Sequence, residues 1–541
     1  MSTRPSFATV TDLRFAWPDG TVVFDGLELA VGPGRHGLVG RNGSGKSTLL
    51  RLLAGQLAPQ RGSVRCAGTV GYLPQDLTLR VDARVDEVLG IADVRRALRA
   101  LESGDVSEQV YATIGTQWDV EDRAEAWLGR LGLDVGLDRR VGEVSGGEAV
   151  LLGLAAQLIR DPDVLLLDEP TNNLDRAARQ RLGEAVSSFG GALLVVSHDA
   201  ELLELMDHIG DLRDRAITWY GGGFSAYQEA RRVEHVAAER AIRSAEADVR
   251  RQQRELIAAQ TKLDRRARYG QKMWDSKREP KIVMGARKRA AQVSAGKHRG
   301  MHQERLAAAQ DQLRSAEEAV SDDAAIRIDL PDTEVPAGRD VLRLEDVVLR
   351  NGVRGDLWLR GPERIAVVGP NGSGKSTLLH TIVGDMTPDA GRCDLRVPAR
   401  LLPQRVDILD EGLSVVDNVA RFAPDAGNNA RRARLARFLF RGRAADQRCS
   451  TLSGGERFRA ALAALLLAEP APQLLMLDEP TNNLDLASID QLVSALTNYR
   501  GALLVASHDE AFLDRVGIDR WLAVSGGRLI DGIRQEPTTP T

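Results

Sequence analysis

The octet Gly-Arg-Asn-Gly-Ser-Gly-Lys-Ser at Gly40–Ser47 recurs as Gly-Pro-Asn-Gly-Ser-Gly-Lys-Ser at Gly369–Ser376. Each copy follows a short apolar run, residues 36–39 and 364–368, that is typical of a buried strand. In such a P-loop, a glycine-rich turn directs backbone N–H groups at phosphates, the lysine reaches the outer phosphates, and the serine hydroxyl binds magnesium. One octet can arise by chance, but two predict a duplicated α/β unit with a phosphate site in each half.

The same four motifs follow both octets in the same order. They are Tyr72-Leu73-Pro74-Gln75 and Leu401-Leu402-Pro403-Gln404, Ser145-Gly146-Gly147-Glu148 and Ser453-Gly454-Gly455-Glu456, apolar runs ending in Asp168-Glu169 and Asp478-Glu479, and Ser197-His198-Asp199 and Ser507-His508-Asp509. Alone, an Asp-Glu pair is usually a solvated strand end and a Ser-Gly-Gly triplet a turn or helix cap. However, the P-loop lysine precedes the glutamine by 29 residues in both halves, and the glutamate precedes the histidine by 29 in both. Unrelated motifs would not keep equal spacing, so we predict two copies of one site.

The paired acids suit the hydrolysis of a phosphoanhydride. This reaction needs a carboxylate near magnesium and a second group that orients or deprotonates the attacking water. By strand alternation, Glu169 and Glu479 point away from the preceding aspartates and suit the role of base. His198 and His508 are candidates to hydrogen-bond the terminal phosphate. The predicted magnesium ligands are Ser47, Gln75 and Asp168 in the first half and Ser376, Gln404 and Asp478 in the second.

In this order the motifs resemble those of the ATP-binding cassette family over most of both halves. The resemblance implies two α/β cassettes that bind ATP with Mg²⁺ and hydrolyse it. It also implies that each Ser-Gly-Gly caps the ATP of the opposite cassette, which pairs Lys46 with Ser453 and Lys375 with Ser145. ATP would then hold the two halves of a monomeric chain together, and hydrolysis would release them. The implied ATP-binding residues are Gly40, Arg41, Asn42, Gly43, Ser44, Gly45, Lys46, Ser47, Thr48, Gly369, Pro370, Asn371, Gly372, Ser373, Gly374, Lys375, Ser376, Thr377, Ser145, Gly146, Gly147, Ser453, Gly454, Gly455 and Trp17.

The adenine contact differs between the halves. Family members usually stack adenine on an aromatic side chain upstream of the P-loop. Trp17 lies at that place in the first half, with Phe15 as the alternative. The matching residues 348–351 include no aromatic residue, although Arg350 could stack through its guanidinium. The sequence therefore does not decide which residue of the second site contacts adenine.

Composition and the length of the apolar runs indicate in which cellular compartment the protein is located. The 541 residues suffice for two domains of about 200 residues and a connector. The chain is 43% hydrophobic with a net charge of −4, and its apolar runs are far shorter than the roughly 20 residues that cross a bilayer. The N-terminus lacks a signal-peptide core, and three scattered cysteines, Cys66, Cys393 and Cys449, disfavour disulfides and zinc. We expect a cytoplasmic protein. Either it is no transporter, or it energises membrane domains on another chain.

A heptad pattern marks the connector, residues 229–335. Apolar residues recur every seven positions in two segments, first Ile242, Val249, Leu256 and Leu263, and then Leu306, Leu313 and Val320. This spacing is typical of coiled-coil helices. We therefore predict a helical hairpin whose first arm is residues 229–268 and whose tip is residues 269–300.

The tip region of this predicted hairpin is basic. Residues 262–305 contain 14 Lys or Arg against four Asp or Glu, and six of the chain's eight lysines. A charge run is more often a solvated helix face. Here one-sided charge at a hairpin end, interleaved with aromatic rings, favours RNA, whose phosphates and unstacked bases accept such side chains. An anionic membrane surface fits less well because no clean apolar face adjoins the charges. The candidate RNA-binding residues are Lys272, Lys277, Arg278, Lys281, Arg287, Lys288, Arg289, Lys297, Arg299 and Trp274.

Tandem cassettes with a basic helical connector and a first-half insertion resemble the ABC-F proteins. The insertion, around residues 100–128, follows from the 70 residues between Gln75 and Ser145 against 49 between the matching residues of the second half. It would form a short arm, although an ordinary loop variation is nearly as compatible. Residues 280–290 are similar to the linker of the resistance-associated branch. Asn173 and Asn483 depart from the histidine of many members.

The ABC-F resemblance implies a ribosomal partner. ATP-driven closure would act on tRNA and rRNA near the peptidyl transferase centre, and protection of the ribosome against antibiotics is the favoured interpretation. A general translation factor, the ATPase subunit of a separate membrane antibiotic exporter, and a DNA-associated cassette protein are the alternatives. The expected domains are cassettes at residues 6–228 and 340–541, joined by the helical linker at residues 229–335.

Overall fold

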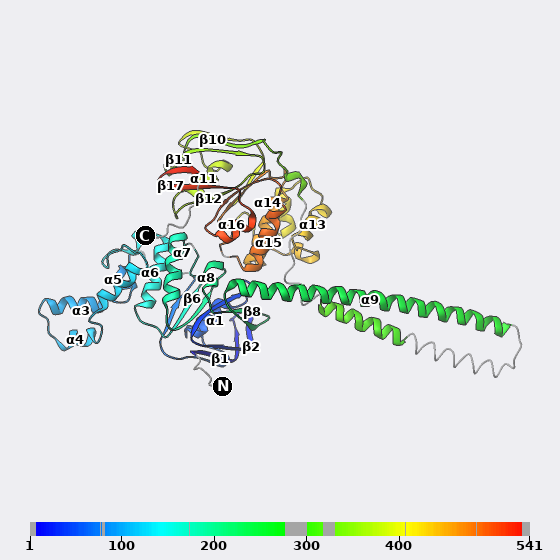
Figure 1. Cartoon of the computed structure of the whole chain (residues 1–541), viewed down its shortest axis with the longest axis horizontal. Helices are drawn as coiled ribbons and strands as arrows, with labels where there is room; N and C mark the ends of the chain where they lie inside the picture. Colours follow the sequence, from blue (N-terminus) through cyan, green and yellow to red (C-terminus); the bar gives the residue numbers. More distant parts are fainter. Residues whose placement is uncertain are drawn as a thin grey trace. The chain divides into compact units, whose positions relative to one another are not determined.

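The computed structural model describes residues 7–75, 77, 82–172, 174–275, 300–316, 330–405, 407–482 and 484–532. The chain divides into two compact units (Figure 1). One comprises Met1–Tyr227 and Ala325–Thr541 and holds both cassettes, and the other is Gln228–Ala324. The predicted fold class, two α/β P-loop cassettes with a helical connector, is confirmed.

The first cassette contains a six-stranded sheet in the order β5-β6-β7-β3-β8-β9. All neighbouring strands are parallel except β8 and β9. A second, antiparallel sheet has the order β2-β1-β4. The strands are β1 (Ala8–Ala16), β2 (Val22–Val31), β3 (Gly34–Gly40), β4 (Arg61–Cys66), β5 (Val70–Leu73), β6 (Val164–Asp168), β7 (Ala192–Val196), β8 (His208–Arg213) and β9 (Ala216–Gly221).

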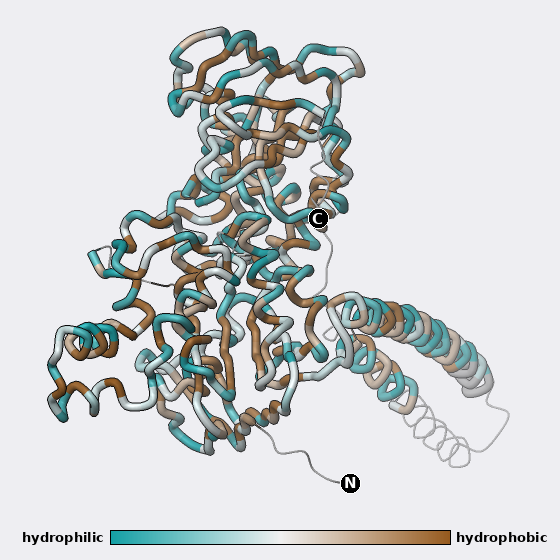
Figure 2. The backbone as a smooth tube through the Cα atoms, turned by 60° about the vertical axis from the view of Figure 1, so that its left-hand side comes forward, coloured by the Kyte–Doolittle hydropathy of each residue, from teal (hydrophilic) through white to brown (hydrophobic). Residues whose placement is uncertain are grey.

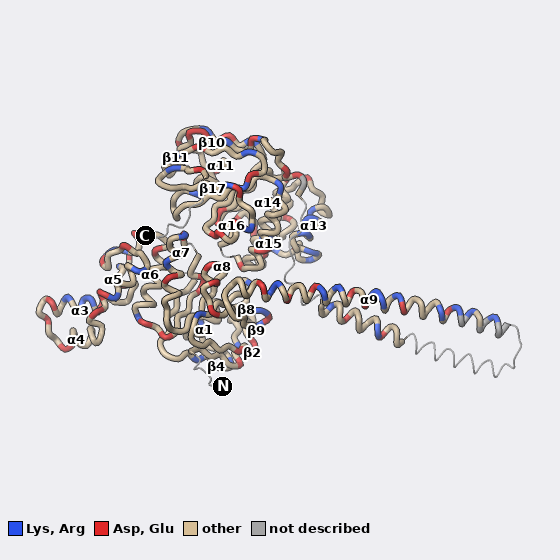
Figure 3. The backbone as a smooth tube through the Cα atoms, viewed as in Figure 1, with Lys and Arg blue, Asp and Glu red and all other residues tan. Residues whose placement is uncertain are grey.

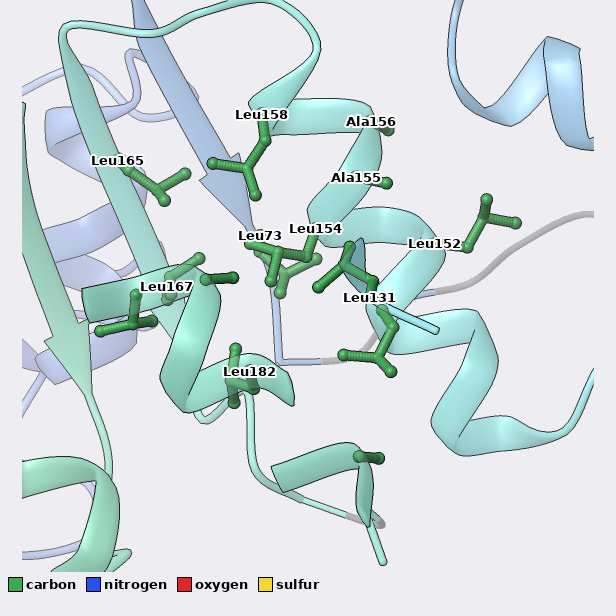
Figure 4. Close-up of a cluster of buried hydrophobic side chains, with 14 of the residues drawn as sticks. Leu73, Leu131, Leu152, Leu154, Ala155, Ala156, Leu158, Leu165, Leu167 and Leu182 are labelled. Atoms are coloured by element: carbon green, nitrogen blue, oxygen red, sulfur yellow. The ribbon is translucent and has the colours of Figure 1, made fainter. Parts of the chain in front are cut away.

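Helices cover the parallel sheet because its central strands are apolar on both faces. Every residue of β6 and β7 is buried, as expected for parallel strands between helical layers. Figure 4 shows Leu167 of β6 and Leu73 of β5 beside Leu154 and Leu182 of the covering helices. The helices are α1 (Lys46–Leu53), α2 (Val85–Val88), α3 (Ala92–Glu102), α4 (Glu108–Ile114), α5 (Val120–Arg130), the 3₁₀ turn Val141–Glu143, α6 (Gly146–Leu158), α7 (Arg176–Ser188) and α8 (Ala200–Glu204).

The residues around 100–128, where the insertion is predicted, fall on α3, α4 and α5, of which α5 packs in the main core of the first cassette. Helices α3 and α4 pack on each other through Ala97, Val110 and Ile114, which form a small separate core. Tyr111 and Trp118 stay 45% and 52% exposed, with ring centroids 6.2 Å apart. Helices α3 and α4 therefore share a small core, and Tyr111 and Trp118 present their rings at the surface.

In the second cassette the two sheets join into one of nine strands, ordered β13-β10-β11-β18-β17-β12-β16-β15-β14. Figure 2 shows hydrophobic strands inside both cassettes and polar loops around them. The elements are β10 (Asp340–Val348), β11 (Arg354–Arg360), β12 (Arg364–Val368), α11 (Lys375–Val383), β13 (Ala390–Leu395), β14 (Ala399–Leu402), α12 (Val415–Phe422), α13 (Asn428–Arg437), α14 (Gly454–Leu466), β15 (Leu474–Asp478), α15 (Leu486–Thr497), β16 (Ala502–Ala506), α16 (Glu510–Val516), β17 (Arg520–Ser525) and β18 (Arg528–Asp531), with 3₁₀ turns at Pro331–Thr333, Gly442–Asp446 and Cys449–Thr451.

The connector is dominated by α9 (Phe224–Asp275), a helix of 52 residues. It is longer at both ends than the predicted arm of residues 229–268. Phe224 and Tyr227 are buried in the core of the first cassette, so the helix begins before its heptad pattern does. Its 52 residues span about 78 Å at ~1.5 Å per residue.

A second helical segment, residues 300–316, lies alongside α9 within the connector (Figures 1 and 2). The predicted seam residues of α9 that recur every seven positions are all partly buried, and Ala309 on the second segment is fully buried. The pattern therefore identified the packed faces of both arms. Val320 lies outside the described residues.

Two candidate nucleotide sites

Each P-loop connects a buried strand to a helix. The first runs from the end of β3 into α1, and the second from β12 into α11. Lys46 Nζ donates to the carbonyl oxygens of Gly40 and Arg41 at 2.7 and 3.0 Å. Lys375 Nζ donates to Gly369 O at 2.7 Å. Both lysine side chains are buried, so the two loops fold around their own cations in the same way.

The predicted magnesium ligands lie together in both halves. Ser47 Oγ is 3.1 Å from Asp168 Oδ1, and both aspartates are buried at strand ends. Burial raises the pKa of Asp478, against hydrogen bonding from Ser376 and the charge of Lys375. Asp478 Oδ1 is fully buried and has no hydrogen-bond partner among the described residues. A hydroxyl, a carboxylate and a glutamine amide oxygen are hard oxygen donors, so this set fits Mg²⁺.

The two adjacent glutamates are held in left-handed backbone conformation. Glu169 has φ 49° and Glu479 has φ 45°. Their N–H groups donate to Val196 O and Ala506 O at 2.8 Å, which fixes each residue just beyond its strand. The sequence argument relied on strand alternation, but β6 and β15 end at the aspartates, and the left-handed turn sets the direction of each glutamate. Non-glycine residues in this region store strain, and such strain concentrates at functional sites.

Each glutamate faces a histidine. His198 Nε2 is 3.1 Å from Glu169 Oε1, and His508 Nε2 is 3.4 Å from Glu479 Oε1. Burial raises the pKa of Glu169 to about 8 and that of Glu479 to about 7, although the P-loop lysines oppose the shift. Burial and the same lysines lower the pKa of both histidines to about 3. The histidines are therefore neutral at pH 7, and the glutamates titrate near neutrality.

Both cavities are built from two cassettes. The first, about 400 Å³, is lined by Lys46, Gln75, Glu169 and His198, and Gly454 reaches it from the second cassette. The other, about 380 Å³, is lined by Lys375 and its neighbours together with Gly146 and Gly147 of the first cassette. The resemblance pairs Lys46 with Ser453 and Lys375 with Ser145; of the signature residues, Gly454 lines the cavity of Lys46, and Gly146 and Gly147 line that of Lys375. Ser145 and Ser453 are the N-cap residues of α6 and α14, and each side chain accepts a hydrogen bond from the backbone N–H of the glutamate three positions on.

The comparisons with known proteins agree with this geometry. A family model described as ABC transporter matches residues 24–172 and 356–482. The tylosin resistance ATP-binding protein TlrC of Streptomyces fradiae is 35% identical over 538 residues, covering 92% of this chain and 94% of that protein. The energy-dependent translational throttle protein EttA of Mycobacterium tuberculosis is 31% identical over 554 residues, covering 94% and 89%. The chain belongs to the ABC-F family. Its two cassettes are accordingly ATP-binding domains.

Solved structures with the same fold include a protein titled RNase-L Inhibitor, with a TM-score of 0.58 and 21% identity over 97% of this chain and 90% of that one. A model of ribosome-bound archaeal Pelota and ABCE1 matches with a TM-score of 0.54 and 21% identity, over 96% and 78%. At this identity the likeness concerns the fold alone. Within the described ranges of the ABC-F chain, no helix has the length and hydrophobicity of a membrane span.

The two ABC-F cavities differ at the place where the sequence predicts the adenine contact. Trp17 lines the first cavity, whereas Phe15 is buried in the cassette core and meets Trp17 edge to face at 5.1 Å. Leu349, the counterpart of Trp17 by the hydrogen bonds of the matching turn, is buried in its cassette core. Asn351 lines the second cavity, and its Nδ2 donates to Ser373 O at 3.4 Å. Arg350, which sequence reasoning offered as a stacking residue, instead donates to Thr387 Oγ1 at 3.3 Å.

The sequence motifs did not identify two further residues of the second cavity. Leu174 and Arg179 belong to the first cassette but line the cavity of Lys375. Both lie just after the Asp-Glu motif of their own half, so their proximity to Lys375 depends on how the cassettes face each other. Asn42 N donates to Asp485 Oδ2 at 2.8 Å, and Arg176 pairs with Glu510 at 2.6 Å across the same interface.

Most of the predicted RNA-binding residues lie outside the described residues, namely Lys277, Arg278, Lys281, Arg287, Lys288, Arg289, Lys297 and Arg299; so do Asn173 and Asn483. Trp274 belongs to α9, but only its backbone is described. The last described turns of α9 carry exposed basic side chains, and Figure 3 shows acidic residues mixed with basic ones farther back. The exposed basic residues in these last described turns are Lys262, Arg265, Arg268 and Lys272.

Proposed function

We propose that this ABC-F protein hydrolyses ATP at both composite cavities and uses the resulting closing and opening of its cassettes to act on the ribosome. The observation that carries the proposal is the composition of the cavities. Each combines a buried lysine, a strained glutamate and a histidine from one cassette with signature glycines from the other. A nucleotide bound there would contact both cassettes, so its binding and loss would change how they associate.

The residues have distinct roles in this proposal. Glu169 and Glu479 take a proton from water, whose oxygen bonds to the γ-phosphorus as the bond to the departing ADP oxygen breaks. Each lysine holds the phosphates and each histidine orients the terminal one. Ser47, Gln75 and Asp168, and likewise Ser376, Gln404 and Asp478, would hold Mg²⁺, which neutralises phosphate charge when bound.

The ribosomal part of the proposal rests on the basic connector and on the relatives. Residues 262–305 would approach tRNA and rRNA near the peptidyl transferase centre, in the cytoplasm and with the protein as a monomer. Antibiotic protection is favoured by the 35% identity to a tylosin resistance protein over nearly the whole chain. A general role in translation is the second candidate, because a translational throttle protein is 31% identical over a similar length.

Cell-free translation inhibited by tylosin distinguishes the two roles. With purified ribosomes and ATP, we expect the protein to restore synthesis at least about threefold and to leave uninhibited synthesis nearly unchanged. A general factor would instead alter synthesis equally with and without tylosin. Lack of co-sedimentation with ribosomes in ATP, or preferential binding to membranes or duplex DNA, would reject the ribosomal proposal altogether.

Charge reversal in the connector tests its contact with RNA. We expect Lys281→Glu, Arg287→Glu, Lys288→Glu and Arg289→Glu together to weaken ribosome binding at least about tenfold, because each lost phosphate contact lowers affinity and its salt dependence. ATP binding should stay unchanged. The matched control reverses four arginines among the mixed charges of α9, namely Arg232, Arg243, Arg250 and Arg251. Equal loss of ribosome binding in both variants would contradict a specific role for the tip.

A further inference from the structure

Arg179 of the first cassette lines the nucleotide cavity of the second. It lies in α7, within the first turn after Asp175, the N-cap residue of that helix. The cavity wall that it joins includes Lys375, Glu479 and His508. Its side chain is only 15% exposed. A nearly buried guanidinium therefore adjoins the residues that the proposed reaction requires.

The orientation of Arg179 is fixed by its own cassette. Its Nε donates to Leu174 O at 3.2 Å, and its Nη1 donates to Asp199 Oδ2 at 2.8 Å. Asp199 is 8% exposed, and its other carboxylate oxygen accepts from Leu202 N at the start of α8. Two partners on two loops hold the guanidinium, so little rotamer freedom remains to be lost when a ligand arrives.

The first cavity has no matching arginine among the described residues. Asp485 caps α15 as Asp175 caps α7, which makes Ile489 the counterpart of Arg179. Ile489 is 6% exposed and belongs to the hydrophobic core of its own cassette. Of the described residues that line the first cavity, only Gly454 comes from the opposite cassette. Among the described lining residues, the second cavity thus has a buried cation from the opposite cassette that the first cavity lacks.

The charge of Arg179 acts on the second site. Burial raises the pKa of Glu479, and the charges of Lys375 and Arg179 both oppose that rise. Asp509 is also within the electrostatic reach of Arg179, so the guanidinium could serve only to neutralise Asp199 and Asp509 where the cassettes meet. That structural role would influence the closing of both sites together. A role inside the cavity would influence one site only.

We propose that Arg179 is a trans-acting residue of the second ATP site, where its positive charge stabilises the phosphates during hydrolysis beside Lys375. The proposal rests on ATP hydrolysis at both sites, as proposed above. Because Arg179 and Lys375 are on different cassettes, hydrolysis at this site requires closed cassettes. The first site has Gly454 from the opposite cassette, but among its described lining residues it has no arginine from that cassette. Arginines supplied in trans raise phosphoryl-transfer rates about 10³–10⁵-fold in the strongest cases, and pairing with Asp199 should reduce the effect here.

Single-turnover hydrolysis by the full-length protein tests each site separately. Glu169→Gln leaves only the second site competent, and Glu479→Gln leaves only the first. We expect Arg179→Ala to slow ADP formation at least about tenfold in the Glu169→Gln protein and less than twofold in the Glu479→Gln protein. ATP affinity should change less than the rate. Arg179→Lys should restore part of the rate, since it returns the charge without the planar fork.

Arg176→Ala is the matched control. It removes an arginine from the same helix that pairs with Glu510 across the interface and does not line the cavity. We expect equal changes at both sites for this variant. Equal slowing of both sites by Arg179→Ala, or no slowing of the second, would overturn the proposal. If the proposed function itself is wrong, the protein without any substitution will form no ADP or will not bind ribosomes. That result differs from each outcome expected for Arg179→Ala.

Discussion

Replacing Glu169 and Glu479 together by glutamine is expected to lower ATP turnover about 10²–10⁴-fold, the usual contribution of a general base. The amide keeps the shape of the carboxylate but cannot accept the proton of water. ATP should still bind, because both P-loop lysines remain. The cassettes would then stay closed around ATP. We expect this variant to sediment with ribosomes in ATP but not in ADP, and to inhibit protein synthesis.

The control for this pair is Glu184→Gln, which changes an exposed glutamate on α7 that accepts a hydrogen bond from Gln180. It should hydrolyse ATP and bind ribosomes as the parent protein does. Two results would count against the assignment. Normal turnover in the double variant would show that another group activates water. If the double variant retains ATP but does not sediment with ribosomes, the ATPase activity is not coupled to ribosome binding.

The sequence predicted which side chains of each half line a cavity better than it predicted the contacts between the halves. Equal spacing of lysine to glutamine and of glutamate to histidine was enough to place these side chains around one cavity, because strand ends and P-loops of one sheet meet at the same edge. The backbone conformation of Glu169 and Glu479 was not accessible in this way. A left-handed glutamate leaves no compositional signal, since glycine would be the usual residue there.

Arg179 shows why the sequence did not predict the contacts between the halves. Its position four residues after Asp175 predicts its place on α7, but its relation to Lys375 exists only after the cassettes meet. Asn351 was missed for a different reason: it lies in the same cassette as Lys375, but among residues 348–351 the sequence analysis considered only an aromatic ring or a stacking guanidinium. In the connector, by contrast, the heptad pattern was local and periodic, so the packed face of α9 could be read directly.

Gly369→Ala is expected to weaken nucleotide binding at the second site while the first site keeps its affinity. Gly369 has φ 152°, and a methyl group there would lie 2.4 Å from Val524 O and 2.9 Å from Ser373 Oγ. Val524 O is backbone of the neighbouring strand β17, so the P-loop must move instead. Gly369 O, which accepts from Lys375 Nζ, would move with it. Strained backbone of this kind costs about 1–3 kcal/mol, and we expect at least about tenfold weaker ATP binding at this site.

Equilibrium binding should then report one tight ATP per chain instead of two. Gly40→Ala provides the mirror experiment, because its methyl group would lie 2.6 Å from Leu212 O and should remove the first site instead. Gly427→Ala is the neutral control in the same cassette as Gly369, since Gly427 has φ −64° and a methyl group there meets no atom within 4 Å. Two tight sites in Gly369→Ala would mean that the P-loop tolerates the methyl group and that its contact with β17 does not shape the nucleotide site. Loss of both sites at once, with an unchanged melting temperature, would instead show that neither cassette holds ATP without the other.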